Sequence, residues 1–185
     1  MSNWNLPTSV EIDGKKYAIT QKCDYRVVLD VIKALKDNDL SEQERVYCAL
    51  YMFYEDLSVF DVAQKAVTEM MKIINNGEEE EPNQPQKPIL VDWEHDFSLL
   101  CPPINRVLGY SLRNKDNYTH WYDFIGAYME IGECNFATVV SIRSKRAKGQ
   151  KLEKHEQEFY KENKKMVDLP FNLTEEEQDW LDSDW

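Results

Sequence analysis

The sequence predicts a mainly α-helical protein, a bundle of about six to eight helices with one small β-hairpin near the N-terminus. Three observations support this fold class. Apolar residues recur at helical spacing through most of the chain. Large apolar groups are densest in two adjacent helical segments, Tyr118–Ile131 and Gly132–Arg143. An Asp13-Gly14 dipeptide separates two short runs of alternating residues, which is typical of a hairpin turn.

The N-terminal segment, residues 1–20, contains this hairpin. Its strands are expected at Val10–Ile12 and Lys15–Ile19. An isolated two-stranded hairpin is only marginally stable in water. We therefore expect it to lie as a lid on the helical core.

Residues 21–76 are expected to form the N-terminal helical part. The first helix runs from Asp24 to Leu35, and Ser41 and Glu44 form a capping box that starts the second. A third helix is expected from about Val59 to Asn75. The side chains predicted to face inward from the second and third helices are Val46, Leu50, Met52, Phe53, Tyr54, Val62, Ala66, Val67, Met70, Met71 and Ile74.

Two polar segments flank the C-terminal half of the chain. Residues 77–90 are acidic and proline-rich, and they cannot bury enough apolar surface to offset the entropy of ordering. We expect a surface linker there. Residues 171–185 form an acidic tail that also carries aromatic residues. Such a tail either folds back on its own domain or anchors to the groove of a partner.

Residues 91–170 are expected to form the C-terminal helical part. Asp92 can cap a helix that contains Pro102 and Pro103, where a kink or a restart is expected. Thr119 is the expected cap of the next helix, in which Trp121, Phe124, Ile125 and Tyr128 form a broad apolar stripe.

Two further helices are expected after Gly132, which is a helix stop signal. Asn135 is the predicted cap of a helix that carries Phe136, Val139, Val140 and Ile142. Residues 151–165 form a charged helix with a thin apolar stripe, Leu152, Phe159 and Met166, which favours an exposed helix or one that awaits a partner.

The formal net charge of -12 disfavours nucleic acid as a partner, because the charge repels phosphates. The basic segment Arg143–Lys151 lacks interleaved aromatic residues, so we interpret its cations as complements to a helix C-terminus. No run approaches the roughly 18 apolar residues of a membrane span. The first residues resemble no secretion signal, so a cytoplasmic location is expected.

The sequence contains no recognisable catalytic, cofactor-binding or metal-binding constellation. The four cysteines are widely scattered and are expected to act as small buried apolar groups. Asp92 and Asp96 share a helix face and could hold a cation, although a solvated face is the stronger interpretation. Cys134 with His120 as its base lacks an orienting third group. We expect a protein that is not an enzyme.

Several short motifs resemble a known family. They are Asp24-Tyr-Arg26, the helix opening at Asp92, Gly109-Tyr110-Ser-Leu-Arg113, His120-Trp121-x-x-Phe124 and Ile142-Arg143. In this order, and over roughly residues 5 to 170, they resemble the gene-fifteen family of phages and prophages of Gram-positive bacteria, which looks like the tail assembly chaperones. Pro102-Pro103 and the aromatic acidic tail depart from the family pattern.

The resemblance implies a non-enzymatic role in tail morphogenesis. The protein would bind the phage tape-measure protein and keep its helices in solution, possible further partners being the tail tube protein and a second copy of the chain. It implies a location in the cytoplasm of the bacterial host and absence from the mature virion. An acidic regulatory or DNA-mimic protein that binds a host protein is the alternative function.

Candidate partner-binding residues follow from residue type and position. Aromatic residues and methionine dominate adaptable interfaces. Trp121 and Phe124 are expected in the core, whereas side chains at the margin of that stripe and in the tail are candidates for partner contact. These candidates are Tyr122, Tyr128, Met129, Trp180, Leu181 and Trp185.

Overall fold

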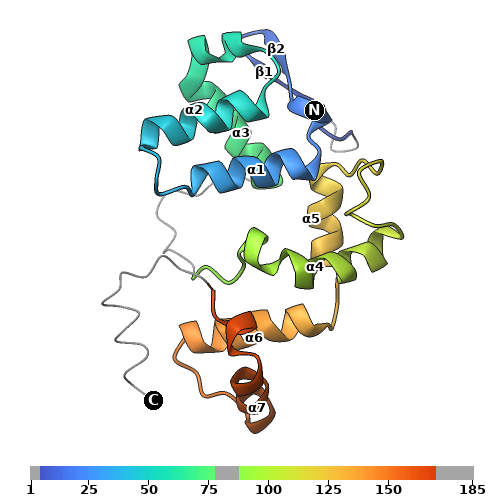
Figure 1. Cartoon of the computed structure of the whole chain (residues 1–185). Coiled ribbons are helices and arrows are strands. Elements are labelled where there is room, and N and C mark those ends of the chain that lie inside the picture. Colours follow the sequence, from blue (N-terminus) through green and yellow to red (C-terminus); the bar gives the residue numbers. More distant parts are fainter. Residues whose placement is uncertain (1–4, 78–87, 170–185) are drawn as a thin grey trace. The chain divides into compact units, whose positions relative to one another are not determined.

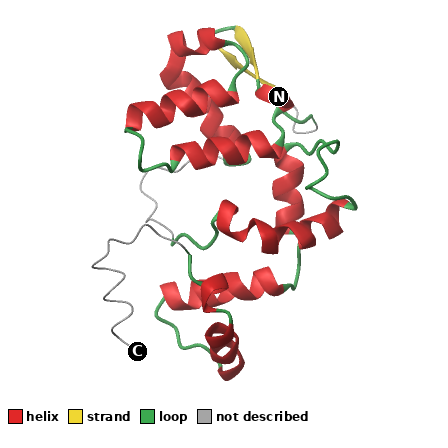
Figure 2. Ribbon diagram, in the orientation of Figure 1, coloured by secondary structure: helices red, strands yellow, loops and turns green. Residues whose placement is uncertain are grey.

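The computed structural model describes residues 5–77 and 88–169. The described residues are mainly helical, with one two-stranded antiparallel sheet (Figures 1 and 2). The predicted fold class is therefore confirmed. In chain order the elements are β1 (Ser9–Ile12), β2 (Lys15–Ala18), η1 (Thr20–Lys22), α1 (Tyr25–Leu35), α2 (Glu42–Phe53), η2 (Leu57–Val62), α3 (Ala63–Ile74), α4 (Trp93–Leu108), α5 (Trp121–Met129), α6 (Asn135–Ala147), α7 (Lys154–Glu162) and α8 (Lys164–Val167), where η denotes a 3₁₀ helix.

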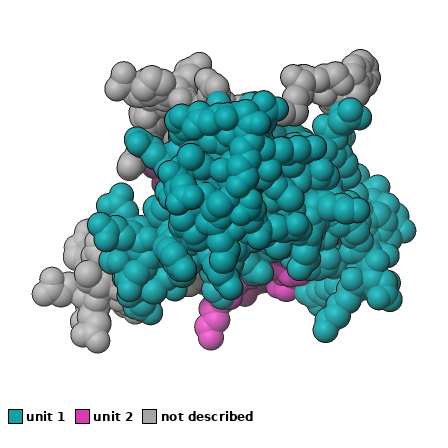
Figure 3. Space-filling model, turned by 90° about the horizontal axis from the view of Figure 1, so that it is seen from above, with its two compact units in different colours: residues 1–85, 101–131 teal, residues 86–100, 132–185 magenta. Residues whose placement is uncertain are grey.

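The chain divides into two compact units, which Figure 3 colours separately. Unit 1 consists of residues 1–85 and 101–131, and unit 2 consists of residues 86–100 and 132–185. The predicted organisation placed one division at residues 77–90. The compact units are composed differently, because residues 101–131 belong with the N-terminal helices.

Helix α4 contributes its first half to unit 2 and its second half to unit 1. The change of unit falls just before Pro102 and Pro103, which lie inside one unbroken helix. The predicted restart at these prolines was therefore wrong. Each proline lacks the N–H that would serve the carbonyl four residues earlier. The flanking residues Leu100, Cys101 and Ile104 are all buried, so their packing offsets this loss.

In unit 1 the hairpin covers helices, as predicted. Asp13 and Gly14 both have positive φ, 52° and 79°, which suits a two-residue turn between right-twisted strands. Val10 pairs with Tyr17 across the strands, and both side chains are buried. The Tyr17 ring meets the Tyr54 ring edge-on, with the centroids 6.3 Å apart. The hairpin therefore buries one face against the end of α2.

The capping box that opens α2 is confirmed. Ser41 Oγ accepts a hydrogen bond from the Glu44 N–H, and the Glu44 carboxylate accepts one from the Ser41 N–H at 2.9 Å. The predicted third helix divides into η2 and α3. Several predicted inward positions differ as well: Ala49 and Ile73 are buried, whereas Val46, Met52, Val62, Val67, Met71 and Ile74 are only partly buried.

The motif Asp24-Tyr25-Arg26 attaches the start of α1 to the loop before α5. Asp24 caps α1 by accepting from the Arg26 N–H at 3.0 Å, and it also accepts from the Thr119 N–H at 3.2 Å. The Tyr25 hydroxyl donates to Leu112 O at 2.9 Å. The Tyr25 backbone N–H also donates a hydrogen bond to Thr119 O, at 2.9 Å. Two segments far apart in sequence are thus held together by a short run of polar contacts.

Arg26 extends this attachment along the same loop. Its guanidinium donates to Leu112 O at 2.8 Å and to the carbonyls of Asn114 and Asn117, both at 3.1 Å. It also forms an ion pair with Asp24 at 3.2 Å. The carbonyl groups of an irregular loop have no partners in regular secondary structure and need other hydrogen-bond donors. Here the guanidinium of Arg26 donates to three of them.

The cap of α5 differs from the prediction. His120 occupies the N-cap position in place of Thr119, and its Nδ1 accepts from the Tyr122 N–H at 3.0 Å. Because Nδ1 is an acceptor, Nε2 carries the proton and donates to Pro7 O at 3.0 Å. Thr119 is buried one residue earlier. Trp121 and Phe124 are fully buried, as expected, and the Trp121 Nε1–H donates to Ile74 O at 3.0 Å.

In unit 2, α6 packs against α7 and α8. Cys134 precedes α6 without a side-chain cap, and Asn135 is the first helical residue, so the predicted Asn135 cap was wrong. Buried Val139, Ile142 and Val167 form a cluster, and the partly buried side chains around it are Leu99, Leu152, Phe159, Tyr160 and Met166. The thin stripe of residues 151–165 is therefore partly buried within this unit, and the predicted single helix is divided into α7 and α8.

Arg143 is the centre of unit 2. Its guanidinium pairs with both carboxylate oxygens of Asp96, at 2.7 and 2.8 Å. It also donates to Leu90 O at 2.9 Å, Met166 O at 2.9 Å and Val167 O at 2.6 Å. These five bonds use all five N–H donors of an arginine side chain. The sequence had suggested that Arg143 complements a helix C-terminus. In the structure it is instead buried and paired with Asp96.

Asp96 is buried rather than solvated. Its side chain has no exposed surface, and besides Arg143 it accepts from the Asp92 N–H at 3.0 Å. Asp92 caps α4 as predicted, because its Oδ1 accepts from the Glu94 and His95 N–H groups at 3.0 and 2.8 Å. Asp96 thus receives the cation of Arg143, whereas the Asp92 carboxylate serves as the cap of α4.

We predict that Asp24→Ala lowers the free energy of unfolding by about 1–3 kcal/mol, because it removes a helix cap and leaves the Thr119 N–H unpaired. Asp24→Asn retains a capping oxygen and should cost less. Urea unfolding followed by tryptophan fluorescence measures both variants, and equal losses would contradict the capping role.

We predict that Arg143→Ala destabilises unit 2 by about 3–5 kcal/mol, because it leaves the Asp96 charge buried and unpaired. Arg143→Lys should also be strongly destabilising, since lysine has at most three donors on one nitrogen. The matched control on the same helix is Arg146→Ala. Arg146 pairs with Asp168 near the surface, where a lost ion pair costs about 0–1 kcal/mol. Similar urea midpoints for Arg143→Ala and Arg146→Ala would refute the prediction.

Candidate protein-binding surface

The predicted partner-binding residues of α5 have different environments. Tyr122 is partly buried, its hydroxyl lies beside Gly77, and burial raises the pKa of its phenol. Tyr128 is partly buried too. Met129, by contrast, is 70% exposed at the end of the helix. Trp180, Leu181 and Trp185 lie outside the described residues. The α5 candidates therefore do not form one exposed surface, although Met129 is open to contact.

A group of three aromatic residues lies on α2 and η2, two of them exposed and Phe60 partly buried. Tyr47 and Tyr51 are each 56% exposed. Their rings are nearly parallel, with an interplanar angle of 12° and centroids 6.4 Å apart. Tyr47 also stacks on Phe60 of η2, with the centroids 4.7 Å apart. We call Tyr47, Tyr51 and Phe60 the α2 surface.

The helical repeat explains why these tyrosines remain outside. Ala49, Leu50 and Phe53 are buried and define the inner face of α2. Tyr47 and Tyr51 are separated by four residues and so share one side of the helix. Ala49 lies two residues after Tyr47, and Phe53 lies two residues after Tyr51. Two residues correspond to about 200° around a helix, so these buried side chains point nearly opposite to the tyrosines. The α2 surface is thus rigidly presented by a helix whose other face is held in the core.

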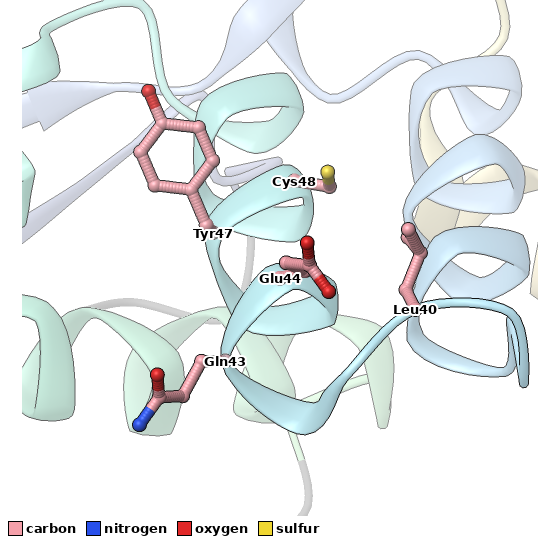
Figure 4. A pocket seen from close by; sticks show the side chains of 5 residues that line it. All are labelled: Leu40, Gln43, Glu44, Tyr47 and Cys48. Atoms are coloured by element: carbon pink, nitrogen blue, oxygen red, sulfur yellow. The ribbon is translucent and has the colours of Figure 1, made fainter.

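A shallow open hollow of about 410 Å³ continues from Tyr47 along α2. It is lined by Leu40, Gln43, Glu44, Tyr47 and Cys48, and its walls are mostly apolar. Figure 4 shows the Glu44 carboxylate and the Cys48 thiol extending from α2 on the side of Leu40, whereas the Tyr47 ring extends to the other side. An apolar hollow beside exposed aromatic rings suits the apolar side chains of a protein partner.

The charge at the edge of this surface is negative. Hydrogen bonds from the Ser41 hydroxyl and then from the Ser41 N–H lower the pKa of Glu44, so Glu44 is ionised at neutral pH. On the side of η2, Lys15 forms an ion pair with Asp56 at 3.0 Å. The hydrogen bond to Asp56 raises the pKa of Lys15, and the charge of Asp61 adds a smaller effect in the same direction.

Sequence reasoning missed the α2 surface. The prediction followed the apolar stripe of this helix and passed over Tyr47 and Tyr51, which lie outside it. The available signal was a pair of tyrosines four residues apart on the polar side of an amphipathic helix. Phe60 could not be added from the sequence, because its contact with Tyr47 depends on how η2 packs against α2.

The described residues offer no second kind of site. Within residues 5–77 and 88–169, no group of three or more His, Cys, Asp or Glu side chains is placed to hold a metal ion. The four cysteines are free, with Cys23 and Cys101 buried and Cys48 and Cys134 partly buried. His120 engages both ring nitrogens in structural hydrogen bonds, so it is not a base for Cys134. None of the described helices has the length and apolar character needed to cross a membrane.

We predict that Asp56 makes the stability of the hairpin and η2 depend on pH. Hydrogen bonding from the Ser58 side chain, with Lys15 next, lowers the pKa of Asp56 from 3.8 to about 2. As the pH falls, the unfolded chain binds this proton first, so the stabilisation present above about pH 4 is lost towards pH 2.

The thermal midpoint of Asp56→Asn should therefore lie below that of the wild type at pH 6, and the difference should shrink at pH 2–3. Glu11→Gln, which removes an exposed carboxylate from β1, serves as the control. A difference between Asp56→Asn and the wild type that is constant over this range would contradict the prediction.

Comparison with known proteins identifies the family. The model of the family described as Bacteriophage Gp15 protein matches residues 3–169. No curated protein and no solved structure matches the chain. The family match spans both compact units and every motif on which the resemblance was based. The chain therefore belongs to the bacteriophage Gp15 protein family.

Proposed function

We propose that this phage protein acts in tail morphogenesis as a chaperone that binds the tape-measure protein without bond-making chemistry. Membership of a phage protein family supports a phage-related role. The observation that carries the finer proposal is the α2 surface, where Tyr47 and Tyr51 are each more than half exposed on a helix. Large exposed aromatic side chains mark surfaces that bind other proteins.

The physical requirement of such a chaperone is a reversible apolar contact. A tape-measure protein is long and helical, and its apolar stripes aggregate when nothing covers them. Tyrosines supply large contact areas with few rotatable bonds, and each keeps a hydroxyl in water. The α2 surface meets this requirement with residues that are fixed by a folded helix. Met129 of α5 is a separate exposed apolar side chain with a flexible stem.

The distribution of charge within the chain bears on solubility. Residues 78–87 contain four glutamates and one lysine, and residues 170–185 contain six acidic residues and no basic one. Together these two segments contribute -9 of the net charge of -12. The other residues carry only -3. The charge that would keep a loaded chaperone in solution is thus concentrated in two short segments.

The same distribution counts against the DNA-mimic alternative. A mimic presents a surface of one sign to a nucleic-acid-binding protein. Outside residues 78–87 and 170–185 the chain has 24 acidic and 21 basic residues, so its acids are matched almost one for one. The tail tube protein and a second copy of the chain remain further possible partners. We expect the protein to act in the cytoplasm of the bacterial host and to be absent from the mature virion.

Co-expression tests the proposal. A helical fragment of the tape-measure protein from the same phage or prophage is produced alone and together with the full chain. We expect the fragment to precipitate alone, and to stay in the supernatant and co-purify when the chain is present. Precipitation of the fragment at every ratio of chain to fragment that is tried would refute the proposal. Turnover of a small substrate by the purified chain would also refute it.

Variants locate the contact in the same assay. Tyr47→Ser with Tyr51→Ser should lose most of the solubilising effect, because the variant removes both exposed rings. Met129→Ser tests α5 separately, and Leu6→Ser removes an exposed apolar side chain outside both places as a control. Full activity of the tyrosine double variant would exclude the α2 surface.

A further inference from the structure

We infer that the α2 surface receives an amphipathic helix whose apolar stripe is flanked by lysine or arginine side chains. The inference rests on the proposed function, because it specifies which helices of a partner the protein covers. Two features of the structure support it: the spacing of the exposed rings along α2, and the charge of the side chains around them.

The spacing of the rings suits a helix. Tyr47 and Tyr51 are one helical turn apart on α2, and Phe60 stacks beside Tyr47 from η2. An amphipathic helix presents its apolar side chains with the same repeat, at i, i+3, i+4 and i+7. The hollow bounded by Leu40 and Cys48 lies next to Tyr47 and can take one further side chain of such a stripe. The two tyrosine rings therefore match one turn of a partner helix, and the hollow offers a further apolar site beside Tyr47.

The charge around the rings is negative and incompletely neutralised. Glu44 lies three residues before Tyr47 and lines the same hollow, with its carboxylate extending towards Leu40 and the Tyr47 ring extending the other way (Figure 4). Its hydrogen bonds come from the N–H and hydroxyl groups of Ser41, which carry no charge. The neighbouring cation Arg45 is partly buried and points about 100° further round the helix. Glu44 thus keeps its charge for a partner.

The cations near η2 are already paired with acids. Lys15 bonds Asp56 at 3.0 Å, and Lys65 bonds Asp13 at 2.6 Å. Asp61 directly follows Phe60 and is exposed. Both elements that carry the aromatic rings therefore also carry an exposed acid, Glu44 on α2 and Asp61 on η2. A partner with basic residues beside its apolar stripe meets opposite charges here, whereas an acidic partner meets like charges.

This charge pattern also decides against a second copy of the chain as the occupant. In a two-fold symmetric contact each copy presents the same patch to the other. The Glu44 and Asp61 side chains of one copy would then face the acidic side chains of its partner. Juxtaposed like charges oppose association. A basic amphipathic helix has no such conflict.

The experiment uses two synthetic helical peptides with the same leucine stripe, one flanked by lysines and the other by glutamates. Binding to the full chain is measured by the fluorescence anisotropy of a labelled peptide at low salt and at about 0.5 M salt. We expect the lysine-flanked peptide to bind at least about tenfold more tightly at low salt, and the difference to shrink as salt is added.

Three variants make the test specific. Tyr47→Ser with Tyr51→Ser should abolish binding of both peptides while circular dichroism stays unchanged. Glu44→Gln removes one charge but keeps an oxygen that can complete the capping box. It should weaken the lysine-flanked peptide about two- to fivefold and leave the glutamate-flanked peptide unchanged or tighter. Glu130→Gln, an exposed acid at the end of α5, is the matched charge control and should change neither affinity.

Equal affinity for the two peptides would overturn the inference, and so would binding that survives the tyrosine double variant. A dimer that dissociates to monomers on Tyr47→Ser with Tyr51→Ser would show that a second copy occupies the surface, which also overturns it. These failures are distinguishable from failure of the proposed function, because the tape-measure fragment could still be solubilised in co-expression through another surface.

Discussion

The structure depends on acidic side chains that are buried and therefore have to be paired. A buried carboxylate without a partner is too costly for a domain of this size. In unit 2 the partner of Asp96 is Arg143, whose remaining donors serve the carbonyls of Leu90, Met166 and Val167. One side chain of α6 thus satisfies the segment before α4, the helix α4 itself and the end of α8. The apolar cluster of Val139, Ile142 and Val167 forms beside this polar centre.

Unit 1 solves the same problem with the Asp24-Tyr25-Arg26 motif. Asp24 is only 3% exposed, and its carboxylate accepts hydrogen bonds from both Arg26 and Thr119. The arginine serves carbonyls of the loop that leads to α5, as Arg143 serves carbonyls in unit 2. Short motifs on which the family resemblance was based thus have a structural explanation. They hold irregular backbone segments whose polar groups would otherwise be unpaired.

Because these motifs maintain the fold, the proposed contact with a partner is expected to use other residues. The residues free to make it are those that the core and the polar centres leave on the outside. On α2 these are aromatic side chains with acids nearby, whereas α5 buries two of its four aromatic side chains, partly buries the other two and exposes Met129. The acidic segments 78–87 and 170–185 carry most of the net charge. In the proposed function, binding and solubility are therefore assigned to different parts of the chain.

The sequence by itself determined the local structure. Helical periodicity, the Asp13-Gly14 turn, the Ser41–Glu44 capping box and the Asp92 cap all depend on residues within a few positions of one another, so pattern and local chemistry were sufficient. Tertiary structure decided everything that joins distant positions. The pairing of Asp96 with Arg143, the choice of His120 over Thr119 as a cap, and the stack of Phe60 on Tyr47 require the chain to fold back on itself. From the sequence alone, a charged residue on a helix is predicted to be exposed. Asp96 is buried because its partner Arg143, 47 residues away, pairs with it in the folded chain.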